Sequence, residues 1–135
     1  MKILIVEDDY SSQQLLKRYL NTHGETVIAE DGEKAIALFR QACDSNQRFD
    51  LICLDIMLPV FDGQIVLQKV RALEEERGIL GLSGCKVLML TALKDADNVI
   101  RAFRSQCEGY LPKPISKERL YREIQSLGLP LKQDA

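Results

Sequence analysis

The sequence lacks the features that would place it in a membrane or on nucleic acid. No apolar run approaches the roughly twenty residues that a transmembrane helix needs, and no basic-plus-apolar leader opens the chain. Its 18 basic and 20 acidic residues are mixed along the sequence, so no basic patch is visible. We therefore expect a cytoplasmic protein that binds neither membranes nor nucleic acid directly.

The cysteines form no recognisable metal or redox motif. Cys43, Cys53, Cys85 and Cys107 include no C-x-x-C pair, and Cys53 lies inside an apolar run. This spacing argues against a zinc site, and reduced structural thiols fit a cytosolic compartment. Internal repeats and low-complexity tracts are absent too, so the 135 residues predict one ordinary domain with its own core.

What the sequence does contain is a regular alternation of short apolar runs with segments of helical periodicity. The expected strands are residues 3–6, 26–29, 51–54, 87–90 and 109–111. The expected helices have their apolar positions within residues 15–20, 35–39, 65–73, 99–103 and 120–127. Strict alternation predicts an α/β fold, a doubly wound five-stranded parallel sheet with right-handed crossovers. The natural strand order is 2-1-3-4-5.

Other segments carry no motif. Residues 78–85 contain three glycines and are typical of a flexible surface loop. The charged run 74–77 before them predicts a solvated helix end, and His23 is expected simply to end the first helix. We assign residues 1–127 to one domain and residues 128–135 to a C-terminal tail, so we expect any output to need a partner.

Charged residues follow three of the expected strands at their carboxyl ends. Glu7, Asp8 and Asp9 come after the first strand, Asp55 after the third, and Lys113 after the fifth. Because the carboxyl ends of parallel strands meet at one edge of the sheet, these side chains should gather there. Several carboxylates beside one lysine predict a site for magnesium and a phosphoryl group.

Each acidic position also has a simpler explanation. Glu7 and Asp8 would repel each other unless a cation offsets them, and Mg²⁺ prefers hard oxygen ligands. A helix cap at Asp8 or Asp9 is the alternative. Asp55 ends a wholly apolar run, and a carboxylate there can act as a nucleophile on phosphorus. Taken alone, it would more often be a turn residue.

Three further positions complete the expected site. Lys113 lies between two prolines, which hold its backbone out of helical geometry and its ammonium toward phosphoryl oxygens. Taken alone, it would be a surface lysine. Thr91 closes the fourth strand, where its hydroxyl could bond an added phosphoryl group. Tyr110 lies in the fifth strand, where an ordinary half-buried aromatic is an equal alternative.

Together these positions resemble the receiver domain of two-component response regulators, and the resemblance extends over residues 2–127. It implies the flavodoxin-like, CheY-like (βα)5 fold, including the strand order given above. It also implies a signalling switch that promotes only its own phosphorylation and dephosphorylation, and so is not an enzyme acting on external metabolites.

The resemblance gives each position a role. The implied metal ligands are Glu7, Asp8, Asp55 and the backbone carbonyl of Met57. Asp55 would be the phosphoacceptor, Thr91 and Lys113 would assist the chemistry, and Thr91 and Tyr110 would act as switch residues. The bond between Lys113 and Pro114 would be cis. Glu7 stands where the family more often has Asp, which leaves the strength of the metal contact open.

The resemblance also implies partners. A sensor histidine kinase or a histidine phosphotransfer protein would supply the phosphoryl group to Asp55, with Mg²⁺ or Mn²⁺ as cofactor. Phosphorylation of Asp55 would then remodel the surface formed by the fourth helix, the fifth strand and the fifth helix. An unknown downstream protein would bind there. A single-domain regulator and a phosphorelay intermediate both fit the sequence.

Three rival functions are weaker. A phosphatase of the haloacid-dehalogenase type needs a second acid two positions after its aspartate, where this chain has Met57. Flavodoxin-like FMN binding needs a hydroxyl- and glycine-rich phosphate loop, where Glu7, Asp8 and Asp9 would repel the phosphate. A constitutive interaction module of the same fold is the third, because fold alone does not fix function. The full residue set argues against it.

Overall fold

A five-stranded parallel sheet forms the centre of the molecule. The structure, a computed structural model, describes residues 1–58, 61–79, 81–92 and 106–132. The strands are β1 (Lys2–Val6), β2 (Glu25–Ala29), β3 (Leu51–Asp55), β4 (Lys86–Thr91) and β5 (Gly109–Pro112). They pair in the order β2-β1-β3-β4-β5, and every neighbouring pair is parallel. The predicted sheet and its order are confirmed.

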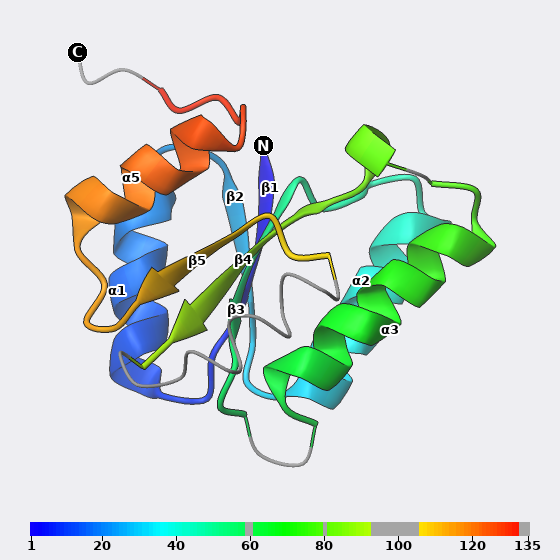
Figure 1. Ribbon diagram of the computed structural model, residues 1–135, viewed down its shortest axis with the longest axis horizontal. Helices are drawn as coiled ribbons and strands as arrows, with labels where there is room; N and C mark the ends of the chain where they lie inside the picture. The colour runs from blue at the N-terminus through cyan, green and yellow to red at the C-terminus, as the bar shows by residue number, and fades with distance from the viewer. Residues whose placement is uncertain (59–60, 80, 93–105, 133–135) are drawn as a thin grey trace.

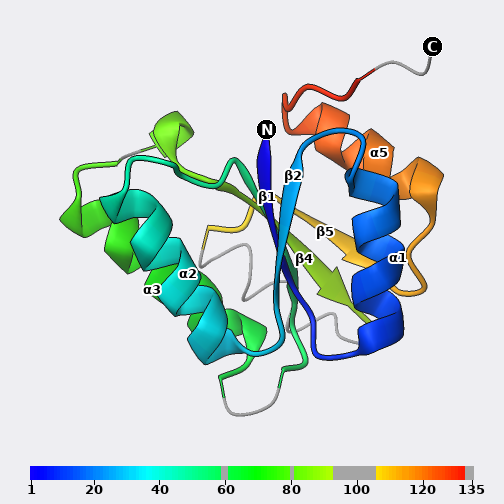
Figure 2. The ribbon, with the colours of Figure 1, turned by 180° about the vertical axis from the view of Figure 1, so that it is seen from behind.

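Helices cover both faces of this sheet (Figure 1). One face carries α1 (Tyr10–Leu20) and α5 (Lys117–Ser126), and the other carries α2 (Gly32–Asp44) and α3 (Gly63–Glu76). Figure 2 shows the same two layers from behind. The helix predicted around residues 99–103 lies outside the described residues. None of the helices in the described ranges is long and apolar enough to cross a bilayer.

The core consists of two apolar layers that meet at the central strands. β1 and β3 are buried on both faces, which explains their continuous apolar sequences. Successive side chains of β1 point to opposite faces, so Leu4 and Val6 pack in the layer of α2 and α3. Ile3 and Ile5 pack in the layer of α1 and α5. The sheet is thereby fixed in position between its helices.

The four α-helices of the described part of the chain begin in the same way. The residue before each helix uses a side-chain oxygen to accept a backbone N–H of the first turn. These capping residues are Asp9, Asp31, Asp62 and Ser116. Asp9, rather than Asp8, therefore caps α1. The sequence alone had left open which of these two adjacent acids is the cap.

The charged run at the end of α3 is the predicted solvated helix end only in part, because Glu75 and Glu76 are exposed but Glu74 is not. Glu74 is buried and accepts hydrogen bonds from Arg71 Nη1 and from the backbone N–H of Cys85, both at 2.6 Å. The connection that leads to Cys85 contains a short 3₁₀ helix, η1 (Gly81–Ser83). The buried carboxylate ties the end of this connection to α3.

His23 and the residues after α5 also differ from expectation. α1 ends at Leu20, and His23 lies buried in the turn that follows. Its Nδ1 accepts the backbone N–H of Lys132 at 2.9 Å. Leu129 and Leu131, in the segment assigned to the C-terminal tail, pack against the core. This part of the tail is therefore docked on the domain.

Candidate functional site

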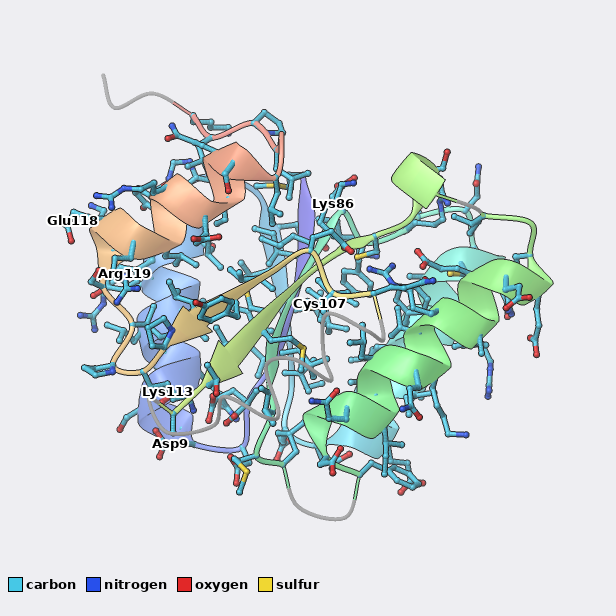
Figure 3. All side chains as sticks on the ribbon, in the orientation of Figure 1. Asp9, Lys86, Cys107, Lys113, Glu118 and Arg119 are labelled. Carbon is cyan, nitrogen blue, oxygen red and sulfur yellow. The ribbon has the colours of Figure 1, made fainter. Side chains whose placement is uncertain are left out.

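The carboxyl ends of three strands bring the predicted site residues together. Glu7 directly follows β1, Asp55 is the last residue of β3, and Lys113 directly follows β5. Backbone hydrogen bonds continue past the strand ends, because the N–H of Glu7 donates to Ala29 (3.1 Å) and that of Lys113 to Thr91 (2.7 Å). The backbone at the site is thus held by the sheet. Figure 3 shows Lys113 and Asp9 at this edge of the sheet.

Lys113 joins the two buried carboxylates. Its Nζ donates to Glu7 Oε2 and to Asp55 Oδ2, both at 2.8 Å. Glu7 is 1% exposed and Asp55 is 4% exposed. Burial lowers the pKa of Lys113, but the hydrogen bonds to Asp55 and Glu7 outweigh it, so the pKa lies above its usual value. The ammonium therefore stays charged between the two acids.

One lysine does not balance this group of acids. Burial raises the pKa of Glu7 to about 7, the hydrogen bond from Lys113 lowers it, and the charge of Asp55 raises it again. The other oxygen of Glu7, Oε1, accepts a longer hydrogen bond from the backbone N–H of Asp9, at 3.2 Å. Among the residues that the structure describes, the ionised site therefore has more negative than positive charge.

The acidic side chains fit a hard divalent cation. Glu7, Asp8 and Asp55 each offer a carboxylate oxygen, and these oxygens all lie within 4.8 Å of one another. Asp8 is exposed, so one side of the cluster is open to water and to an incoming group. Mg²⁺ is bound in proteins by one or two carboxylates together with waters and phosphate oxygens. The raised pKa of Glu7 supports the same conclusion, because a bound cation would stabilise its ionised form.

Met57 lies in the loop after Asp55. Its backbone N–H donates to Asp55 Oδ1 at 2.9 Å, while its side chain is 64% exposed. Asp55 is consequently held at both oxygens, by Met57 on one side and Lys113 on the other. The role of the Met57 carbonyl as a metal ligand stays a prediction.

The two expected switch residues lie on neighbouring strands. Thr91 is buried at the end of β4, and its hydroxyl donates to the carbonyl of Ala92 at 3.1 Å. Tyr110 lies on β5, where it pairs with Met89 and is 44% exposed. The Lys113–Pro114 bond is cis, as the resemblance implied.

Two residues that sequence reasoning missed support the site. Gln13 is buried on α1, and its Nε2 donates to the carbonyl of Glu7 at 2.7 Å. Gly63 begins α3, where a Cβ would collide with the carbonyl oxygen of Asp55 and lie 2.7 Å from Ile56 Cα. A polar residue at a core-facing helix position was the available signal for Gln13. The glycine after the capping Asp62 was the signal for Gly63.

Comparison with known proteins agrees with this geometry. The model of the family described as response regulator receiver domain matches residues 3–125. The probable transcriptional regulator ycf27 of Porphyridium aerugineum is 32% identical over 127 residues, which are 93% of this chain and 47% of that protein. The chain therefore spans about half the length of this relative.

Two solved structures share the architecture. One is the co-crystal structure of the Saccharomyces cerevisiae histidine phosphotransfer protein Ypd1 and the receiver domain of Ssk1. The match has a TM-score of 0.81 and 27% identity, and covers 95% of this chain and 88% of that one. The other is the receiver domain of the sensor histidine kinase PA1611 of Pseudomonas aeruginosa PAO1, with a magnesium ion in its active site cleft. Here the TM-score is 0.75 with 27% identity, and the match covers 94% and 97% of the two chains.

Proposed function

The chain belongs to the response regulator receiver domain family of two-component signalling, and we propose that it accepts a phosphoryl group on Asp55 in a magnesium-dependent reaction. The observation that carries the proposal is the contact of Lys113 Nζ with both Asp55 and Glu7 at 2.8 Å. A buried carboxylate beside a fixed ammonium and further acids has the groups that phosphoryl transfer to an aspartate needs. Receiver domains are signalling switches rather than metabolic enzymes.

The donor is a phosphohistidine on a sensor histidine kinase or on a histidine phosphotransfer protein. A carboxylate oxygen of Asp55 forms the new bond to phosphorus, the phosphorus–nitrogen bond breaks, and the imidazole leaves with the electron pair. The co-crystal of the Ssk1 receiver domain with the histidine phosphotransfer protein Ypd1 supports this class of partner. Met57 N–H and Lys113 orient Asp55 for the step.

A metal ion would be held by Glu7, Asp8 and Asp55, together with the carbonyl of Met57. Bound Mg²⁺, or Mn²⁺, supplies positive charge beside the phosphoryl oxygens. Lys113 Nζ then exchanges its contact with Asp55 Oδ2 for one with a phosphoryl oxygen, whose charge it neutralises. The magnesium ion in the PA1611 receiver domain supports this assignment.

Phosphorylation is the signal because it changes the charge at one edge of the sheet. The new group adds about 1.5 to 2 negative charges. The Thr91 hydroxyl moves toward it and donates a hydrogen bond to a phosphoryl oxygen. Tyr110, half exposed beside it, then turns inward and shifts the population of surface conformations. The downstream partner binds at β5, α5 and the predicted fourth helix, the last of which lies outside the described residues.

Intact-mass measurement after incubation with acetyl phosphate tests the proposal. Wild type should gain about 80 Da, one phosphoryl group, with Mg²⁺ and not without it. Asp55→Asn should gain nothing. Asp50→Asn is the matched control because Asp50 precedes the same strand at its other end, and it should gain the group as wild type does. Equal uptake by Asp55→Asn, or none by wild type, would contradict the proposal.

A further inference from the structure

The chain reverses direction after α5 and returns along the domain. Gly128 adopts a positive φ of 81°, which glycine allows without strain, and ends the helix in a left-handed turn. Its N–H donates to Gln125 at 3.0 Å, and that of Leu129 donates to Ile124 at 3.3 Å. Residues 128–132, which we call the strap, then lie near the start of β1 in both ribbon views (Figures 1 and 2).

The strap is attached by apolar contacts at the end of the sheet opposite Asp55. Leu129 and Leu131 are partly buried and pack against the core layer between the sheet and helices α1 and α5. Pro130 lies between them and limits the backbone freedom of the strap. The strap therefore covers part of the core instead of extending into solvent.

A single imidazole holds the far end of the strap. His23 is 5% exposed, and its Nδ1 accepts the backbone N–H of Lys132 at 2.9 Å. Its ring lies edge-on against Tyr121 of α5, with the ring centres 4.8 Å apart. The hydroxyl of Tyr121 donates to the carbonyl of Tyr19 on α1 at 2.6 Å. His23 thus joins α1, α5 and the strap.

The hydrogen bond to Lys132 requires one protonation state of His23. Nδ1 accepts only when it keeps its lone pair, so the ring is neutral with its hydrogen on Nε2. The protonated ring carries a hydrogen on both nitrogens, and Nδ1–H would then point at the N–H of Lys132. Histidine is the side chain that ordinarily changes charge between pH 5 and 8.

Charged groups surround His23 on the elements packed around it. They line or border a shallow depression between β1, β2, the turn before β3 and the strap. These groups are Lys2, Arg48, Lys132, Glu25, Asp50 and the amino group of Met1. The titratable ring in contact with His23 is that of Tyr121 on α5, whose hydroxyl already donates to the carbonyl of Tyr19. Cations outnumber carboxylates here, so a charged His23 adds to repulsion against the strap lysine.

We propose that the strap is a proton-sensitive latch, held by neutral His23 and released when His23 is protonated. Release frees the backbone of Lys132 first and then loosens Leu131 and Leu129 from the core. It works independently of phosphorylation, because His23 and Asp55 lie at opposite ends of the sheet.

Amide hydrogen exchange of the whole chain, followed by NMR between pH 5 and pH 8, tests the latch. The His23 ring signals report its protonation in the same samples. After correction for the intrinsic pH dependence of exchange, the protection of the Lys132 amide should fall roughly tenfold as His23 is protonated, as for the loss of one buried hydrogen bond.

Two variants separate the latch from general loosening of the domain. His23→Asn places a non-titrating oxygen near the position of Nδ1, so Lys132 protection should no longer depend on pH. His23→Ala should remove the protection at every pH. Unchanged protection of Lys132 after His23 has titrated, a His23 ring that stays neutral down to pH 5, or the same pH dependence in His23→Asn would each overturn the proposal. Phosphoryl uptake in both variants should equal that of wild type.

Discussion

Two charge clusters at opposite ends of the sheet share one arrangement, a cation between two carboxylates, but have different properties. At the carboxyl end, Lys113 bridges Glu7 and Asp55 at 2.8 Å. At the amino end, Arg71 bridges Glu74 at 2.6 Å and Glu108 at 2.7 Å. Each cluster therefore places one cation between two largely buried carboxylates. The clusters differ in whether other groups of the protein complete the hydrogen bonds and charge pairs of these side chains.

At the amino end, protein groups complete the cluster. Arg71 also donates to the backbone carbonyls of Gln106 and Cys85 at 2.7 to 3.0 Å. The carboxylates of Glu74 and Glu108 accept the backbone N–H groups of Cys85 and Val87. Burial lowers the pKa of Arg71, but its contacts with Glu74 and Glu108 outweigh it and raise the pKa overall. Such a cluster joins α3 to the starts of β4 and β5.

At the carboxyl end, the protein leaves the cluster incomplete. A third carboxylate, that of exposed Asp8, lies within 4.8 Å of the other two, and burial raises the pKa of Glu7 to about 7. Within the described ranges, the fold thus retains acidic groups there that Lys113 alone does not neutralise. The comparison teaches that a saturated cluster stabilises the fold, whereas an unsaturated one is available to a ligand.

The largest expected effect is on stability, from Arg71→Met. Removing the guanidinium leaves Glu74 and Glu108 without their cation, so the free energy of unfolding should fall by ~3 to 5 kcal/mol. Urea denaturation measures the change. Arg77→Met, at the residue that caps the end of the same helix, breaks a more exposed ion pair with Asp44 and should cost much less. Equal costs for the two variants would show that the Arg71 cluster stabilises the fold no more than an exposed ion pair does.

Glu7→Gln should change how stability depends on pH. Folding raises the pKa of Glu7 from 4.5 to about 7, so the folded state holds the proton more tightly than the unfolded state. Wild type should therefore lose stability as pH rises from about 4.5 to about 7, by ~3 kcal/mol if Glu7 acts alone. The variant should lack this loss in metal-free buffer. If the free energy of unfolding depends on pH in the same way in both proteins, ionising Glu7 does not destabilise the fold, and the prediction is wrong.

The smallest expected effect is from Asp8→Asn, which should weaken Mg²⁺ binding about tenfold by removing one charged ligand. Stability without metal should change little because Asp8 is exposed. Asp9→Asn is the matched neighbour, since Asp9 caps α1 and asparagine also caps helices well. A titration in which both variants bind Mg²⁺ equally would place Asp8 outside the metal site.

The sequence predicted the sheet and the gathering of Glu7, Asp55 and Lys113 because both depend on regular patterns. Apolar strands alternate with helices, and the carboxyl ends of parallel strands share one edge. The residues that carry these patterns are adjacent or regularly spaced in the chain. The positions of the site residues follow directly from the strand ends.

The sequence did not predict the surroundings of Glu74 and His23, because their partners come from distant parts of the chain. Glu74 accepts the backbone N–H of Cys85, which lies 11 positions away beyond a glycine-rich connection, and His23 accepts that of Lys132, 109 positions away. A charged run before a glycine-rich connection is expected to be solvated. Its burial at Glu74 follows only from the position of Cys85, directly before β4. Gln13 was missed as well but differs from both, since a polar residue on the buried face of α1 is itself a signal of a specific contact.

The most direct test of the account is the number of protons that Mg²⁺ releases on binding. Calorimetric titrations near pH 7, in buffers of different ionisation enthalpy, measure that number. If Glu7 is partly protonated there, wild type should release a substantial fraction of a proton for each Mg²⁺ bound, and Glu7→Gln should release none. Binding to wild type without proton release, or no Mg²⁺ binding at all, would contradict the claim that the carboxyl-end cluster lacks positive charge.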